Sequence, residues 1–193
     1  MKIIDIEFIP IFPRLAKRYQ KNTFLVKDLE YRVIVRVKTD IGITGYGDER
    51  IRPYWEPPTQ AALEPLIDRN PFDFINSGEL SGYGFGFSLG GALYDVMGKY
   101  LEMPAYKLMG QKLRDGVSVA AWCPNFPAKT FGEEVARAAS QGYGIIKMHT
   151  HSLYDPIEQT LAAEEAAPPG FKIHYDFNGG RGRTVAGLLP LIH

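Results

Sequence analysis

The sequence predicts an α+β region followed by an α/β region, with the change near residue 115. Two observations carry this prediction. Residues 31–48 alternate between apolar and polar side chains around a tight turn, which is typical of an antiparallel hairpin. Farther along, three short apolar segments end near Trp122, His149 and Asp176, which lie 27 residues apart with helical patterns between them. Such even spacing indicates repeated βα units and a parallel sheet.

The composition is that of an ordinary globular protein and excludes several classes. The 193 residues suffice for one domain, or for one domain and part of another. The 22 basic residues balance the 22 acidic residues, so no overall field attracts nucleic acid or an anionic membrane, and we expect neither as a partner. The single cysteine, Cys123, excludes an intrachain disulfide and favours a cytoplasmic location. Acidic residues inside the first apolar run argue against a signal peptide.

The first region is predicted to be an antiparallel sheet followed by helices. The strands are expected at residues 4–11, 31–39 and 43–48, with a turn at 40–42 and a long loop at 13–29. Apolar stripes predict helices over 60–68 and about 86–101, the second with Leu89, Leu93, Val96, Met97 and Tyr100 on one side. Pro104 follows the second helix, as a helix-ending residue does.

The second region is predicted to alternate strand and helix. Strands are expected at residues 117–122, 145–149 and 171–176. A capping box, Thr130 to Glu133, opens one predicted helix that ends near Gly142. Asp155-Pro156 opens the next, and Thr184 caps a last one. In such sheets the chemistry lies at the carboxyl ends of the strands.

Lys147 and His149 are two residues apart at the end of one predicted strand, so both point to the same face. A cation and a titratable imidazole at that position can stabilise a carboxylate and move a proton. The alternative is two polar residues at a solvated strand end.

Asp176 and Asn178 repeat this geometry one βα unit later, and their oxygen atoms suit a hard cation such as Mg²⁺. The alternative is a turn that begins before Gly179.

His149, His151 and His174 give only weak support for a zinc site, because no further ligands have metal-like spacing. The glycines of residues 82–86 lack the context of a phosphate-binding loop.

Four segments together resemble the mandelate racemase/muconate lactonizing branch of the enolase superfamily. They are Gly91–Lys99, Pro104–Gly110, Lys147-x-His149 and Asp176-x-Asn178, and the resemblance covers the whole chain in order. It implies an enolase-like capping domain over residues 1–113. Residues 114–193 then start a modified TIM-type (β/α) barrel, of which about three βα units are present. The barrel is incomplete, because a full one takes about 250 residues.

The resemblance also implies a chemistry and a set of site residues. The family binds Mg²⁺ with three acids on successive strands and removes the proton α to a carboxylate. Asp176 matches the first metal ligand and Asn178 its companion, a substrate-binding position. Lys147 matches the first lysine of the family's Lys-x-Lys. The capping-domain regions that cover substrate match residues 14–28 and 49–56, which contain Tyr19, Arg50, Tyr54 and Trp55.

The chain departs from the family pattern in two ways. His149 stands where many members have the second lysine, the base on one face of the substrate. The strands expected to carry the other metal acids and the opposite base are absent, so we expect this chain to bind Mg²⁺ weakly or not at all.

Two hypotheses about function follow. The first is an acid-sugar dehydratase (a lyase), or a racemase, epimerase or cycloisomerase (an isomerase), acting on small hydroxy acids and inactive as this chain alone. It is expected to form a homo-oligomer or to associate with the missing barrel portion. The alternative is a non-catalytic truncated remnant that acts only as an assembly module. An RNA-binding module that uses Arg181 and Arg183 is a distant third.

Overall fold

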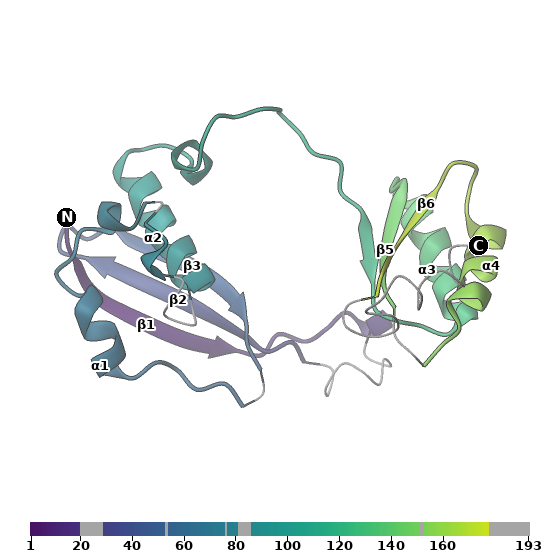
Figure 1. Cartoon of the computed structure of the whole chain (residues 1–193), viewed down its shortest axis with the longest axis horizontal. Coiled ribbons are helices and arrows are strands. Elements are labelled where there is room, and N and C mark those ends of the chain that lie inside the picture. The colour runs from purple at the N-terminus through teal and green to yellow at the C-terminus, as the bar shows by residue number, and fades with distance from the viewer. Residues whose placement is uncertain (20–28, 53, 76, 81–85, 151–152, 178–193) are drawn as a thin grey trace. The chain divides into compact units, whose positions relative to one another are not determined.

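The computed structural model describes residues 1–19, 29–52, 54–75, 77–80, 86–150 and 153–177. The described residues form two compact units that divide between Asp115 and Gly116 (Figure 1). Each unit has its own sheet and its own helices. Within the described part of the chain, no helix has both the length and the apolar character needed to cross a membrane.

The sheet of the first unit is antiparallel and has the order β1-β2-β3. Its strands are β1 (Ile3–Ile11), β2 (Arg32–Thr39) and β3 (Thr44–Arg50). The predicted hairpin is confirmed, because β2 pairs with β3 along its whole length and Val35 lies opposite Gly47. Gly42 in the connecting turn has a φ of 83°, a conformation that favours glycine.

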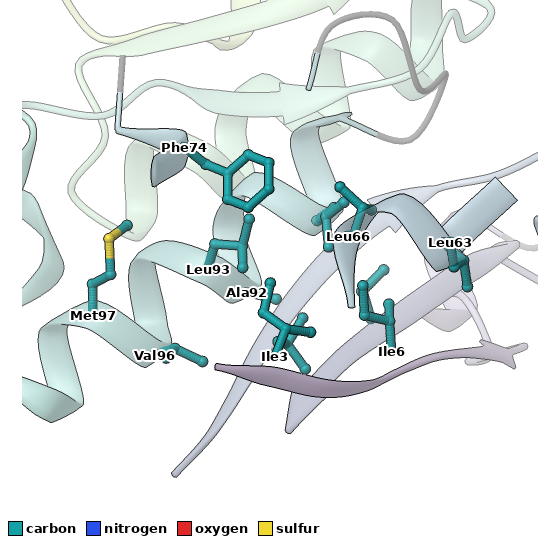
Figure 2. Close-up of a cluster of buried hydrophobic side chains, with 12 residues drawn as sticks. Ile3, Ile6, Leu63, Leu66, Phe74, Ala92, Leu93, Val96 and Met97 are labelled. Atoms are coloured by element: carbon teal, nitrogen blue, oxygen red, sulfur yellow. The ribbon is translucent and has the colours of Figure 1, made fainter. Parts of the chain in front are cut away.

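Helix α2 (Gly86–Tyr100) packs on one face of this sheet. The alternation of β2 turns Val33, Val35 and Val37 toward the core, where they are buried. The helix comes so close to β3 that a Cβ atom added to Gly47 would lie 1.8 Å from the carbonyl oxygen of Ser88. The resulting core brings residues of β1, α2 and the intervening segments together, including Ile3, Ile6, Leu66, Phe74 and Leu93 (Figure 2).

Two predictions for the first unit need correction. The helix expected over residues 60–68 is a single α-helical turn, α1 (Gln60–Leu63), followed by a 3-10 turn at Glu64–Leu66. Pro65 explains the change, because proline has no N–H with which to continue an α-helix. Tyr100 was expected on the buried stripe of α2, but it is the last residue of the helix and half exposed. Further 3-10 turns lie at Lys17–Tyr19, Pro71–Phe74 and Ala105–Leu108.

The sheet of the second unit is parallel and has the order β4-β5-β6. Its strands are β4 (Ala121–Cys123), β5 (Ile145–His149) and β6 (Lys172–Asp176), and the connecting helices are α3 (Ala128–Ser140) and α4 (Pro156–Ala166). The helices pack so closely that a Cβ atom on Gly132 would lie 2.8 Å from the carbonyl oxygen of Ala162. An antiparallel sheet with helices and then a parallel sheet with helices confirm the predicted fold class, and the described strands close no barrel.

Two predictions for the second unit also need correction. The strand expected at residues 117–122 pairs only over Ala121–Cys123, and Val117 and Val119 are 71% and 70% exposed. No described strand lies beside them to complete a ladder. Helix α3 begins at Ala128 after Pro127, so Thr130 lies inside the helix and is not its cap. The cap at Asp155 is confirmed: its carboxylate accepts a hydrogen bond from the N–H of Ile157 at 2.8 Å. The helix predicted after Thr184 lies outside the described residues.

Candidate functional site

The candidate site lies on one face of the parallel sheet, at the carboxyl ends of its strands. Side chains of a strand alternate between the two faces of a sheet. Ile146 and Met148 of β5 are fully buried, and α3 packs against this strand. Lys147 and His149 therefore point to the opposite face, where both are partly exposed. This placement follows directly from the spacing of the two residues in the sequence.

Lys147 and His149 both approach the carboxylate of Asp176. The parallel pairing of β5 with β6 sets His149 opposite Asp176. The Nζ atom of Lys147 lies 2.5 Å from Oδ2 of Asp176, and Nε2 of His149 lies 3.4 Å from the same oxygen. The N–H of Thr150 donates to the carbonyl oxygen of Asp176 at 2.8 Å and holds the two strand ends together. Three of the predicted site residues thus converge on one point.

The charged groups of this cluster remain accessible to water. The side chains of Lys147, His149 and Asp176 are 32%, 39% and 33% exposed. A carboxylate in a partly exposed ion pair with a lysine can exchange this partner for a ligand at little cost. The arrangement can hold an anionic group of a substrate and can accept or return a proton.

Trp122 and His174 complete the described part of this face. Trp122 of β4 lies opposite Lys147 in the ladder, and its ring contacts the ring of His149 edge to face, with centroids 5.6 Å apart and planes at 79°. His174 of β6 is the other neighbour of Lys147. No role was predicted for Trp122 from its sequence position, although its distance of 27 residues from His149 was the available signal.

The segment that follows β4 is held in place from the helix layer. Gln159 of α4 is fully buried, and its Nε2 donates to Oδ1 of Asn125 at 2.8 Å and to the carbonyl oxygen of Phe126. Asn125 and Phe126 are themselves buried.

Burial also raises the pKa of the Cys123 thiol to about 12. Glu134 raises this pKa by a smaller amount, and Arg137 lowers it. Cys123 is therefore a packing residue and not a nucleophile of the site.

The described residues do not form a complete site for a divalent cation. No group of three or more His, Cys, Asp or Glu side chains able to hold a metal occurs among them. Asp176 supplies one carboxylate, and the ammonium of Lys147 lies against it. A hard cation needs about six oxygen ligands, so Asp176 by itself does not fit Mg²⁺. Asn178 and His151 lie outside the described residues.

The four predicted substrate-covering residues lie in the first unit and are described within it. Tyr19 is buried, and the Arg18 guanidinium carbon lies 4.3 Å from the centre of its ring. Nε of Arg50 lies 2.9 Å from Oε1 of Glu30, and the ring of Trp55 lies 6.2 Å from that of Phe8. Tyr54 is 83% exposed. Their contact with substrate stays a prediction, as do the roles of Lys147, His149 and Asp176.

The chain is similar in sequence to enzymes that act on carboxylic acids. It is 31% identical to a D-xylonate dehydratase of Haloferax volcanii over 81% of this chain and 47% of the relative. It is 27% identical to an N-succinyl-L-Arg/Lys racemase of Bacillus cereus over 100% of this chain and 57% of the relative. The chain spans about half the length of the curated relatives it matches. No protein-family model matches it.

The fold is that of the N-terminal part of known enzymes. A dipeptide epimerase of Enterococcus faecalis superimposes with a TM-score of 0.76 at 20% identity, over 100% of this chain and 56% of the other. The same epimerase has also been solved with Mg and the dipeptide L-Leu-L-Tyr. A mandelate racemase/muconate lactonizing enzyme of Roseiflexus superimposes with a TM-score of 0.74 at 15% identity, over 98% and 55% of the two chains. The resemblance predicted from the sequence is confirmed.

Proposed function

We propose that the chain forms part of an enzyme that removes the proton α to a carboxylate. The support is its sequence resemblance to, and its fold in common with, the N-terminal part of the mandelate racemase/muconate lactonizing enzymes of the enolase superfamily. The substrate is a small hydroxy acid or acid sugar. The reaction is dehydration, or racemisation or epimerisation. The observation that carries the proposal is the convergence of Lys147, His149 and Asp176 at neighbouring strand ends.

Each of the three side chains has a role in this proposal. Lys147 turns its ammonium from Asp176 to the substrate carboxylate and stabilises the negative charge that develops on its oxygens. The imidazole of His149, in its neutral form, accepts the α-proton. In a dehydration, the electron pair left on the α-carbon then expels the β-hydroxyl group, which takes a proton and leaves as water. In a racemisation, a proton from water or from a group outside the described residues is added to the opposite face.

Magnesium belongs to this proposal only for the complete family fold. The epimerase structure with Mg supports Mg²⁺ as the family's cofactor. Asp176 would be one of its ligands and would need further carboxylates from outside the described residues. Asp176 would then hold the cation, and the ammonium of Lys147 would contact the substrate carboxylate.

The first experiment measures exchange of the α-proton with deuterium from solvent. The chain, and any longer product of its gene, is incubated with Mg²⁺ in D₂O with D-xylonate, D-galactonate, N-succinyl-arginine and a dipeptide, and the products are analysed by NMR and mass spectrometry. Deuterium at the α-carbon is expected with at least one acid in the longest product of the gene, together with loss of water for a dehydratase or inversion for a racemase, and no exchange is expected in this chain alone.

Matched variants connect this exchange to the cluster. His149→Asn is expected to lower the exchange rate by about 10²–10⁴, as removal of a general base does. His174→Asn changes a histidine on the same sheet face and is expected to leave most of the exchange intact. Absence of exchange with every acid, in the longest product of the gene, contradicts the proposal and favours the assembly module.

We also propose that the second unit associates with further strands, either of a second copy or of the missing barrel portion. The outer strands β4 and β6 each have an edge that no described strand pairs, and such edges invite pairing with another chain. Sedimentation of the purified chain tests this. A dimer, or a complex with the remaining barrel, is expected, and a monomer with residues 144–193 well ordered contradicts it.

A further inference from the structure

Trp122 places an aromatic ring among the charged side chains of the candidate site. Its neighbours on β4, Ala121 and Cys123, are buried with the helices, so Trp122 points to the same face as Lys147 and His149. Trp122 lies opposite Lys147 in the ladder. Its ring contacts the ring of His149, which lies two residues farther along β5 on the same face. The two centroids are 5.6 Å apart, within the range of favourable edge-to-face pairs.

The imidazole of His149 is therefore restrained from two directions. The indole of Trp122 contacts its ring, and Oδ2 of Asp176 lies 3.4 Å from its Nε2. A histidine that is 39% exposed and has no lateral contact would populate several rotamers. The aromatic contact favours the observed rotamer, in which Nε2 lies 3.4 Å from Oδ2 of Asp176, because other rotamers lose this contact.

Trp122 is itself held by the rest of the unit. The residues that follow it, Cys123, Asn125 and Phe126, are all buried. The hydrogen bonds from Gln159 fix Asn125 and Phe126 to α4. Trp122, itself 39% exposed, thus precedes a buried segment that hydrogen bonds attach to α4.

From these contacts we infer that Trp122 is a positioning residue for the base of the site: it holds the His149 imidazole in the orientation that accepts the proton. This inference rests on the proposed function for the role of His149. A general base acts efficiently only when its nitrogen is already directed at the proton it removes. Trp122 acts through His149 and is assigned no contact with the reacting atoms.

The experiment uses the whole chain, labelled with ¹³C-histidine, and observes the imidazole proton resonances by NMR at one pH. The His149→Asn variant identifies the His149 signals. In the wild-type chain we expect nuclear Overhauser effects between the Trp122 indole and the His149 ring, and ring resonances displaced from those of a free histidine. In Trp122→Ala both are lost and the His149 resonances move to the free position. In Trp122→Phe, which keeps a smaller ring, the displacement is reduced.

A matched control separates positioning from general effects of losing a tryptophan. Trp55→Phe changes the other tryptophan, in the first unit, and is expected to leave the His149 signals unchanged. Unchanged His149 signals in Trp122→Phe, or in a folded Trp122→Ala, overturn the inference. The readout needs no activity. Failure of the deuterium-exchange assay with the Overhauser effects present removes the proposed function and leaves the contact of Trp122 with His149 as a structural contact, whereas exchange without these effects removes only the positioning role.

Discussion

The two units use charged residues on an open sheet face in different ways. On the free face of β1–β3, basic side chains of β2 pair with acidic side chains of the neighbouring strands: Arg36 with Glu7, Lys38 with Asp5, and Arg32 with Asp48. On the free face of β4–β6, Lys147 and His149 both approach Asp176. The first face spreads its opposite charges across the strands. The second gathers two basic groups around one carboxylate.

The two units also differ in the packing of the apolar side chains behind these faces. The first unit buries a continuous apolar core between its sheet and α2 (Figure 2). The buried side chains of the second unit, Phe131, Val135, Ile146 and Met148, lie on the helix side of the sheet, and its free face carries aromatic and titratable groups. The described part of the first unit thus gathers its apolar side chains in a core, and that of the second places titratable side chains at strand ends beside edges that no described strand pairs. The following predictions test this contrast.

The largest effect is expected at Cys123, which reports opening of the second unit. Its pKa is raised from 9.0 to about 12, mainly by burial, so at pH 8 the thiolate is scarcer than in an unfolded chain by about a thousandfold. Alkylation by iodoacetamide at pH 8 should be slower in the native chain than in urea by at least this factor. A comparable rate in the two states means that the second unit opens readily and contradicts the buried position of Cys123.

The next effect concerns the core of the first unit. Leu93 of α2 is 1% exposed, so Leu93→Ala removes buried methyl groups and should lower the free energy of unfolding by about 2–5 kcal/mol. Each unit contains one tryptophan, and urea unfolding can be followed by Trp55 in Trp122→Phe and by Trp122 in Trp55→Phe. The Trp55 transition should move and the Trp122 transition should not.

The control for this prediction is Leu113→Ala, a change of the same size at an exposed position. It should alter stability by no more than about 0.5 kcal/mol. A shift of both tryptophan transitions in Leu93→Ala contradicts the separation of the cores into two units.

The sequence predicted local patterns and the common edge at which the strand ends lie, but not every pairing or contact between strands. The hairpin of β2 and β3 was predictable because alternation and the turn at Gly42 are local. The meeting of Lys147, His149 and Asp176 was predictable because even spacing places strand ends at one edge. Val117 and Val119 also alternate, but a strand needs a neighbour, and none of the described strands pairs with them. The contact of Trp122 with His149 depends on register, which a single sequence does not contain.

A smaller effect is expected at alkaline pH from Tyr175 of β6. Burial raises the pKa of its phenol, against a hydrogen bond with Thr160 that lowers it and with a further increase from Glu164. Because the folded pKa lies above the ordinary value of 10.0, its contribution to stability is complete below pH 10 and is lost as the pH rises through the folded pKa. Tyr175→Phe should therefore lose less stability than the wild type above pH 10, measured by the Trp122 transition. An equal loss in both proteins contradicts this.

The smallest effects are expected from the ion pairs, and they sharpen the contrast between the two faces. The side chains of Arg36, Glu7, Lys147 and Asp176 are all about one third exposed, so water screens both pairs. Double-mutant cycles with Arg36→Met and Glu7→Gln, and with Lys147→Met and Asp176→Asn, should each give a coupling free energy of about 0.2–1 kcal/mol that decreases with added salt. If the proposed function holds, the two faces differ in role and not in stability: Arg36→Met should leave the deuterium exchange of the longest gene product unchanged, whereas Lys147→Met should lower it while the protein stays folded. A coupling well above this range for Lys147 and Asp176 alone would mean that their pair is a structural ion pair, and loss of exchange in Lys147→Met would then follow from loss of structure.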